Sequence, residues 1–557
     1  MFKLKPVIIL LVVFALYFMS QTSPAGVEIK NLPDEEKQLV DTTDPWGLAF
    51  SDQIARYESY FTQNKDGEFV VGVSHNLVKI WPNKYWFRGD IIKPGEKQVW
   101  KTLWTVTGSS VSFQVAILPK IGAKPTRYTI EVNAPVKNIV YREEYVKLGE
   151  AAYPRFQSNS WPDPLVPENS SVISGMKLGA FLVELKIPEN FSGKQFACTV
   201  KVSAEEGKSL QFTIPVEVVK LNIQPGKIPL VAWFNFDRNV ISENQFKQMY
   251  EMALENHLQP LTQAYLQTLW NLQQPEQFER FVRTSMSKGQ TIFQINEPDE
   301  KMYRFLKDKN WLSSFMIYSN ADEPDEASLR EKNIPYAEKI HKLYPGLKIF
   351  LASEYYPGME KACDIWMTDL SSCRYDPRTF TVPKNLILWH YYCHLPVNFQ
   401  MRSPLTLAPN MMIDNPGLQH RLALWMSWHY NAKGVFIWSG NMEWNSLGNN
   451  FWQNLEIAEQ NYKYPYGGIH HGNGFLVYPP KEENGPVLPS LRLKILRDGV
   501  EDIAIFEAAA KQYGGKLKKS LNPAPTVFVH PHYYDNLPET LLNKREQILK
   551  ELRVLGL

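Results

Sequence analysis

The feature that most constrains the fold is a repeated alternation after Pro225-Gly226, where short apolar runs are separated by amphipathic helical stretches. Strands that alternate with helices in this way are typical of a parallel sheet with crossover helices. Eight runs are present, at 230–234, 259–264, 291–295, 314–318, 348–352, 364–367, 386–389 and 434–438. Because a (β/α)8 barrel uses about 250 residues, this count predicts a closed barrel rather than an open sheet.

Amphipathic helices are expected between most of these runs. The clearest are 243–255, 275–287, 327–343 and 418–431, and 489–512 would be the eighth helix. We therefore assign residues 226–512 to the barrel. The remaining polar segment, 513–557, is expected to be a tail with one more helix at 538–552.

The chain before the barrel has a different pattern, in which short alternating segments are separated by turn residues. Such segments occupy 100–118, 127–132, 181–187, 196–202 and 210–221. Regular short strands with few helical periods are typical of an antiparallel β-sandwich. The predicted fold is thus multidomain, with an N-terminal antiparallel β-sandwich over 26–225 followed by a (β/α)8 TIM barrel.

The first 25 residues have the pattern of an export signal. Lys3 and Lys5 precede an uncharged run at 6–19, and small residues follow at Ser20, Ser23 and Ala25. Since a membrane-spanning helix needs about 20 apolar residues, this run is short for an anchor. We predict a signal peptide over 1–25 and a secreted or extracytoplasmic protein. The alternative is a retained N-terminal anchor, which alone would bring the protein to a membrane.

Charge and motifs argue against several classes of partner. Sixty basic and 58 acidic residues leave a net charge of +2, which gives no excess for neutralising phosphates, so we expect no nucleic-acid partner. No G-x-S-x-G, H-E-x-x-H, P-loop or G-x-G-x-x-G motif follows a strand, and the sequence predicts neither a metal nor a cofactor. The four cysteines are sparse, so they form either one bridge, such as Cys363–Cys373, or buried thiols.

Candidate site residues follow from the barrel, because active sites of this fold lie where its strands end. The predicted strand ends carry carboxylates, amides and aromatic rings, and lysine is absent from them. This mixture suits sugars, since carboxylates serve glycosidic chemistry and aromatic faces stack on pyranose rings. The expected substrate-binding residues are Asn235, Glu354, Trp389, Tyr391, Trp438 and Trp444.

Two arrangements of catalytic carboxylates are open. Retention by double displacement needs an acid and a nucleophile about 5 Å apart, for which Glu297 and Asp369 are candidates. Against it, the predicted seventh strand ends in aromatics and histidines without a carboxylate. In substrate-assisted hydrolysis the 2-acetamido oxygen of the sugar is the nucleophile, and the adjacent Asp322 and Glu323 would orient the acetamido group and protonate the leaving oxygen. A simpler alternative is a solvated loop, because Pro324 and Asp325 have the pattern of a helix start.

The order of sandwich and barrel, Tyr318-x3-Asp322-Glu323-Pro324, and the segment Arg497-Asp498-Gly499-Val500-Glu501-Asp502 together resemble glycoside hydrolase family 123. The resemblance covers about residues 60 to 510. It implies an exo-acting β-N-acetylgalactosaminidase in which Asp322 and Glu323 are the catalytic pair of a substrate-assisted mechanism.

The expected function is therefore an exported glycosidase that removes terminal β-linked N-acetylgalactosamine from a glycan or glycolipid. Two alternatives remain at this point. One is a non-catalytic carbohydrate-binding protein that keeps the barrel as a platform. The other is a glycosidase of different specificity that acts by double displacement through Glu297 and Asp369.

Overall fold

The computed structural model describes residues 67–82, 87–92, 98–120, 122–148, 160–174, 177–221, 223–370, 372, 374–393, 408–460, 471–482, 485–515 and 517–556. The predicted signal segment, 1–25, lies outside these ranges. None of the helices within them has both the length and the hydropathy that a bilayer-spanning segment requires.

The N-terminal part is a β-sandwich, as predicted. One sheet has the order β2-β1-β4-β9-β6-β7 and the other β3-β11-β10-β5-β8, and within them only the β3–β11 pair is parallel. The strands are β1 (Phe69–His75), β2 (Asp90–Ile92), β3 (Leu103–Val106), β4 (Ser110–Pro119), β5 (Thr126–Asn133), β6 (Lys137–Lys147), β7 (Ser160–Val166), β8 (Ser170–Ile173), β9 (Gly179–Lys186), β10 (Gln195–Ala204) and β11 (Ser209–Val219).

Alternation along the strands explains how the two sheets pack. In β10, Cys198, Val200 and Val202 are buried, whereas the alternate residues Thr199, Lys201 and Ser203 are half-buried. They face the core that both sheets share. The six-stranded sheet differs, because β4 and β9 are buried on both faces. Its second face packs on the barrel domain, which joins the two domains through a continuous apolar core.

The second domain contains eight parallel strands at the predicted places. They are β12 (Leu230–Trp233), β13 (Leu258–Leu261), β14 (Phe293–Ile295), β15 (Phe315–Tyr318), β16 (Lys348–Ala352), β17 (Ile365–Thr368), β18 (Ile387–Tyr392) and β19 (Val435–Ser439). Their order is β13-β12-β19-β18-β17-β16-β15-β14. The seventh strand is longer than predicted and includes Tyr391 and Tyr392.

The barrel is not fully closed, in contrast to the closed barrel predicted, because the edge strands β13 and β14 share no ladder of backbone hydrogen bonds. Pro260 lies within β13 and has no N–H to donate. Side chains bridge the gap instead. The amide oxygen of Gln259 accepts from the backbone N–H groups of Thr291 (2.9 Å) and Ile292 (3.1 Å), and Gln290 Nε2 donates to the Pro260 carbonyl at 3.0 Å.

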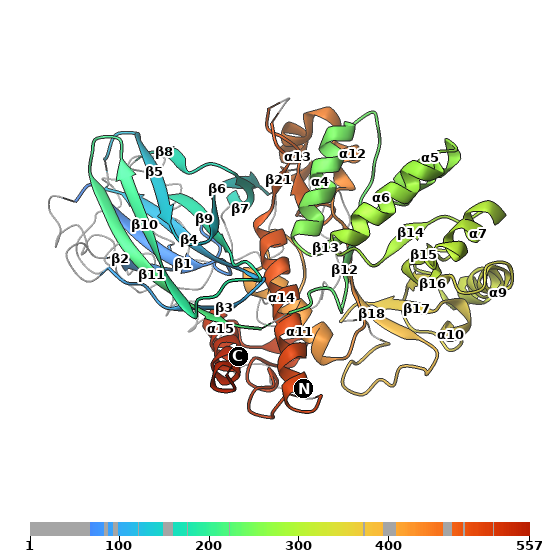
Figure 1. The fold of residues 1–557 in the computed structure, drawn as a ribbon. Coiled ribbons are helices and arrows are strands. Elements are labelled where there is room, and N and C mark those ends of the chain that lie inside the picture. Colours follow the sequence, from blue (N-terminus) through green and yellow to red (C-terminus); the bar gives the residue numbers. More distant parts are fainter. Residues whose placement is uncertain are drawn as a thin grey trace, which may run out of the picture.

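Helices surround the barrel (Figure 1). They are α4 (Glu243–Glu255), α5 (Gln263–Asn271), α6 (Pro275–Ser287), α7 (Glu300–Asp308), α8 (Glu326–Ser328), α9 (Ile334–Leu343), α10 (Met359–Ala362), α11 (Gly417–His429), α12 (Glu443–Leu447), α13 (Phe451–Gln460) and α14 (Leu491–Gln512). The last helix, α15 (Pro538–Val554), packs instead on β3 and β11 of the sandwich. The helix predicted at 327–343 is interrupted by a π-helical turn, η4 (Leu329–Asn333).

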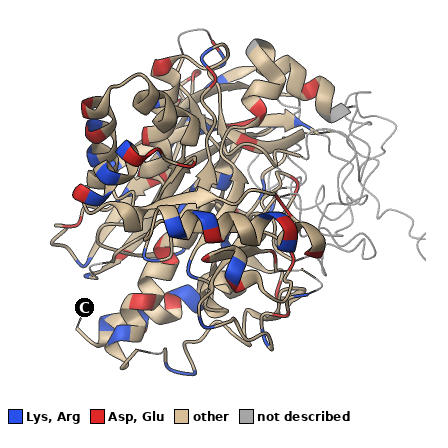
Figure 2. Ribbon diagram, turned by 90° about the vertical axis from the view of Figure 1, so that its right-hand side faces the viewer, with Lys and Arg blue, Asp and Glu red and all other residues tan. Residues whose placement is uncertain are grey.

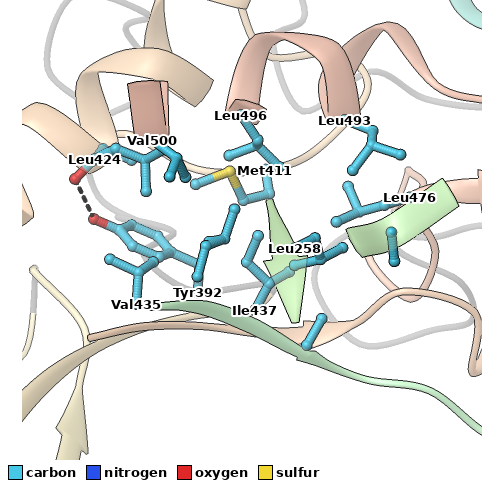
Figure 3. Close-up of a cluster of buried hydrophobic side chains, with 14 of the residues drawn as sticks. Leu258, Tyr392, Met411, Leu424, Val435, Ile437, Leu476, Leu493, Leu496 and Val500 are labelled. Carbon is cyan, nitrogen blue, oxygen red and sulfur yellow. Dashed lines mark hydrogen bonds between the residues drawn. The ribbon is translucent and has the colours of Figure 1, made fainter. Parts of the chain in front are cut away.

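Helix α14 lies between the sandwich and the barrel (Figure 1). Its apolar side packs on the outside of the strands, where Leu493, Leu496 and Val500 meet Tyr392 and Ile437 (Figure 3). Its charged side faces the sandwich. Arg492 Nη2 lies 2.9 Å from Asp163 Oδ2 of β7, and Arg497 pairs with Glu184 of β9.

The charged side chains of the Arg497–Asp502 segment are therefore buried at the interface between the two domains. Charged residues on a helix more often form solvent-exposed ion pairs. Arg492, Arg497, Glu501 and Asp502 are each at most 2% exposed. Elsewhere, basic and acidic residues are intermixed along the surface helices in the view of Figure 2. This distribution agrees with the net charge of +2.

Candidate active site

The candidate site lies at the ends of the barrel strands, and the loop after β15 is its centre. This loop carries Asp322 and Glu323, both of which are exposed. A helix starts directly after these residues, as predicted. Its N-cap is Asp325, whose carboxylate accepts a hydrogen bond from the Ser328 N–H at 2.8 Å. Neither Asp322 nor Glu323 is used to cap the helix, so both carboxylates remain available to a ligand.

Two buried side chains hold this loop in place. Asn333, in the π-helical turn, is fully buried, and its amide donates to Ser319 Oγ (2.8 Å) and to the Ala321 carbonyl (2.9 Å). Ser353 directly follows β16, and its hydroxyl lies 3.3 Å from the Pro324 carbonyl and 2.8 Å from the Glu354 carbonyl, so it ties the two loops together. A π-turn inside a helix is frequent at functional sites. Here it places an amide under the candidate catalytic loop.

Tyr318 orients Asp322. Its hydroxyl donates a hydrogen bond to Asp322 Oδ1. The tyrosine ring is fixed by Trp233 and Phe350, whose centroids lie 5.3 Å and 5.0 Å away in edge-on geometry. Burial, and then the charge of Asp322, raises the pKa of Tyr318 well above its usual value, so the phenol keeps its proton and remains a donor.

Glu323 differs from its neighbour in both conformation and protonation. Its φ is +40°, in the left-handed region that residues other than glycine rarely adopt, and such strain clusters at functional sites. Although the side chain reaches solvent, its carboxyl is partly desolvated by the surrounding residues, which raises the pKa of Glu323, and the charges of Asp322 and Asp369 raise it further. A carboxyl group with this shift holds a proton at a higher pH than an ordinary glutamate, which suits a general acid.

Tyr391 and Asp369 complete the group around Glu323. Asp369 follows β17 directly, and Tyr391 is the fifth residue of β18. Burial raises the pKa of Tyr391 well above the usual range, and the charges of Cys393 and Glu323 add to the effect. The structure thus brings Tyr318, Asp322, Glu323, Asp369 and Tyr391 into one electrostatically coupled cluster.

Three other predicted binding residues also lie at strand ends. Asn235 follows β12, and its backbone N–H and carbonyl are held by the buried Asn441 side chain at 2.7 Å and 2.9 Å. Glu354 follows β16 and accepts from Ser372 Oγ at 2.5 Å. Trp438 is half-buried in β19. Their contact with a substrate stays a prediction.

Trp389 and Trp444 lie in apolar surroundings instead. Trp389 is 3% exposed inside the barrel, where its indole contacts Gly434. It precedes Tyr391 by two residues on the same face of β18, so it lies deeper in the barrel. Trp444 is 2% exposed on α12, and its indole N–H donates to the Val477 carbonyl at 3.0 Å. These positions favour a packing role for both.

Glu297, the acid of the double-displacement alternative, makes an ion pair with the outer helix layer. Its Oε1 lies 2.7 Å from Lys339 Nζ of α9. Asp369, the other member of that pair, instead acts electrostatically on Glu323. This arrangement favours Asp322 and Glu323 over Glu297 and Asp369.

The cysteines are thiols where the structure describes them. Cys198 and Cys363 are buried free thiols, Cys393 is buried as well, and Cys373 lies outside the described residues. Burial raises the pKa of Cys198 to about 12, which makes this thiol unreactive. Among the residues described, no cluster of three or more His, Cys, Asp or Glu side chains could hold a metal ion.

Comparison with known proteins identifies the domain that carries this site. Residues 244–509 match the model of the glycoside hydrolase 123 catalytic domain. The barrel domain of this chain thus belongs to glycoside hydrolase family 123. The matched region includes Asp322, Glu323 and all the barrel strands except β12.

Solved structures support the fold. A family 123 glycoside hydrolase from Clostridium perfringens, studied for the details of glycolipid glycan hydrolysis, has 14% identity and a TM-score of 0.63, over 88% of this chain and 100% of the other. A Bacteroides ovatus GH5 xyloglucanase has 9% identity over 82% of this chain and 99% of the other, but its TM-score of 0.18 indicates no shared fold. A search of the curated proteins finds no match.

Several site residues were not predicted from the sequence. Asn333 and Asn441 brace the loops, and Trp233 supports Tyr318 while its indole N–H donates to Gln294 Oε1 at 2.5 Å. A signal existed only for Tyr318, which ends a predicted strand four residues before Asp322. Asn333 carries no comparable signal, because an amide inside a helical pattern is ordinarily a surface residue.

Proposed function

We propose that this family 123 hydrolase is an exo-acting β-N-acetylgalactosaminidase that cleaves terminal sugars of glycans or glycolipids by substrate-assisted, retaining hydrolysis. The observation that carries the proposal is that two adjacent carboxylates, Asp322 and Glu323, lie in different environments suited to different roles. Asp322 is held by the Tyr318 hydroxyl, whereas Glu323 has a raised pKa and a left-handed backbone that separates it from its neighbour.

In the first step the carbonyl oxygen of the substrate's 2-acetamido group forms a bond to C1. The bond from C1 to the glycosidic oxygen breaks, and Glu323 gives its proton to that oxygen. Asp322 accepts a hydrogen bond from the acetamido N–H and stabilises the positive charge that develops on the cyclised group. The products of this step are an oxazolinium intermediate and the free leaving alcohol.

In the second step the Glu323 carboxylate takes a proton from water, and the water oxygen forms a bond to C1. The bond from C1 to the acetamido oxygen breaks, and the amide is restored. Two displacements at C1 give net retention. Both require Asp322 to keep its orientation, which the Tyr318 hydroxyl and the Asn333 amide support through the loop.

The choice of glycans rests on the family and on the Clostridium perfringens relative, whose study concerned glycolipid glycan hydrolysis. Export rests on the basic and apolar start of the chain. N-terminal sequencing of protein recovered outside the cytoplasm should give a chain that begins near residue 26. A recovered chain that begins at Met1 would contradict cleavage.

The function is tested with paired aryl glycosides. The N-acetyl-β-galactosaminide should be hydrolysed, and the β-galactoside that lacks the acetamido group should be inert. A thiazoline mimic of the cyclised intermediate should inhibit. Equal rates on both glycosides would refute substrate assistance, and hydrolysis of neither would favour a binding protein.

A further inference from the structure

A polar side chain lies inside the barrel, among apolar ones. Gln294 is 1% exposed in the middle of β14, and its neighbours on the strand, Phe293 and Ile295, pack in the core between the strands and the helices. Because side chains alternate along a strand, Gln294 lies on the inner face, where the apolar residues of the barrel interior gather. A buried amide costs free energy unless its hydrogen bonds are made, so its partners indicate its role.

Both ends of the Gln294 amide are used, and they join the ends of two other strands. Its oxygen accepts a hydrogen bond from the Trp233 indole N–H at 2.5 Å, and its nitrogen donates to Gln263 Oε1 at 2.5 Å. Trp233 ends β12, and Gln263 is the first residue of α5, two residues after β13. The Gln294 amide cannot turn over without losing both bonds, and it therefore fixes the orientation of the Gln263 amide.

The Gln263 amide keeps a donor for a ligand. Its side chain is exposed, and within the part of the chain that the structure describes Gln263 Nε2 donates to no acceptor. Because Gln294 holds the amide oxygen, the nitrogen is the group that is left to bind. Residues that follow barrel strands face the C-terminal mouth, where ligands of this fold bind.

A short series of contacts connects Gln263 with the candidate catalytic pair. Two hydrogen bonds and one amide group separate Gln263 Oε1 from Trp233 Nε1, a span of at most about 8 Å. The Trp233 ring lies against Tyr318, whose hydroxyl donates to Asp322. The free amide nitrogen thus belongs to the same mouth as the carboxylates.

The seam between β13 and β14 does not by itself require this pair of glutamines. Gln259 and Gln290 already bridge the seam beside the N-terminal end of β14. The bond between Gln294 and Gln263 lies toward the other end of the strand, at the mouth. It holds an amide where a ligand binds, which the first bridge does not.

We propose that Gln263 donates a hydrogen bond through Nε2 to a ring hydroxyl of the cleaved sugar, and that Gln294 is its positioning residue. The inference rests on the proposed function, because it assumes that the acetamido group of this sugar lies at Asp322. The contact makes Gln263 a specificity-determining residue, since a site built to bond one hydroxyl discriminates against a sugar that lacks it. Gln294 itself touches no substrate and acts by holding Gln263 and Trp233.

The experiment measures kcat/KM for the 4-nitrophenyl N-acetyl-β-galactosaminide and for its 3-, 4- and 6-deoxy forms. Q263M keeps the length of the side chain but removes the amide, so kcat/KM for the parent glycoside should fall about 3- to 10-fold through KM, as expected for one neutral hydrogen bond. On the one deoxy form that lacks the bonded hydroxyl, Q263M and the wild type should agree within about twofold. Q294M should give the same pattern, because Gln263 then loses its orientation. The control Q267M makes the same change one turn further along α5 and should alter none of these values.

The outcomes separate failure of this contact from failure of the proposed function. Equal losses on all deoxy forms, or no loss on the parent glycoside with Q263M, would overturn the contact, while hydrolysis by the wild type would still support the proposed function. If the wild type hydrolyses none of these glycosides, the proposed function fails and binding decides the role of Gln263. N-acetylgalactosamine should then bind to the wild type and to Q267M in saturation-transfer NMR, and more weakly to Q263M. Absent binding, or equal binding to all three, would overturn the contact.

Discussion

The hydroxyl of Tyr318 donates a hydrogen bond to Asp322 Oδ1 four residues further along the chain. The tyrosine belongs to a strand whose ring neighbours, Trp233 and Phe350, come from β12 and β16. The position of a loop carboxylate is therefore set by the barrel interior. An aspartate that must hold one acetamido group needs such support, because loops alone position side chains poorly.

Replacing Tyr318 by phenylalanine tests this support. The ring would still pack on Trp233, but the hydrogen bond to a charged acceptor would be lost, which costs about 1.5–3 kcal/mol. We expect kcat/KM to fall about 10- to 100-fold with little change in the melting temperature. Y355F removes the hydroxyl of a half-buried tyrosine of the next loop and should leave kcat/KM within about twofold.

The pH profile tests the environment of Glu323. Its raised pKa means that the proton donor is lost only as pH rises above the usual range for glutamate, so the alkaline limb of kcat/KM should lie above that range. D369N removes one of the charges that raise this pKa and should move the limb to lower pH. D376N removes a surface carboxylate and should leave it in place. If the alkaline limb of D369N lies at the same pH as that of the wild type, the charge of Asp369 does not raise the pKa of Glu323.

Asn333 should affect stability and catalysis together. Its amide bonds Ser319 and Ala321, so N333A should lower the free energy of unfolding by about 1–3 kcal/mol and also lower kcat. Asn256 is a matched control, since it is 3% exposed and donates to the Met252 carbonyl at 2.8 Å at the far end of α4. N256A should destabilise to a similar degree with kcat unchanged. Equal effects on kcat would show that Asn333 acts only through stability.

The sequence predicted most of the architecture because apolar runs and helical periods are local. All eight barrel strands and the pair Asp322 and Glu323 were located from such patterns. Local patterns carry no information on how distant segments meet. The bridging role of Gln259 depends on β14, and the burial of Arg492 depends on a sandwich strand more than 300 residues away.

The assignment of Trp389 to the site shows a second limit. Trp389 and Tyr391 lie on the same face of β18, and only the depth of the strand in the barrel separates them. The sequence placed the end of this strand at residue 389, whereas β18 ends at Tyr392. With the wrong end, the buried ring of Trp389 could not be distinguished from the ring of Tyr391 near the barrel mouth.

The buried pair of Arg492 and Asp163 should dominate the attachment of the two domains. Both side chains are at most 1% exposed, and D163N would leave the Arg492 charge without its partner. We expect the free energy of unfolding in denaturant to fall by about 3–5 kcal/mol. E300Q, which breaks the exposed pair with Arg304, should cost less than about 1 kcal/mol. Equal small effects would contradict a structural role for α14 at the interface.

The most direct test of the central claim is the dependence of two variants on the leaving group, measured as kcat/KM for a sugar aglycone and for a dinitrophenyl aglycone. With E323Q we predict a loss of about 10²–10⁴-fold on the sugar aglycone and a much smaller loss on dinitrophenol, which departs without a proton. With D322N both substrates should lose activity alike, because acetamido attack precedes either departure. Equal losses on both substrates with E323Q would contradict the assignment of Glu323 as the general acid.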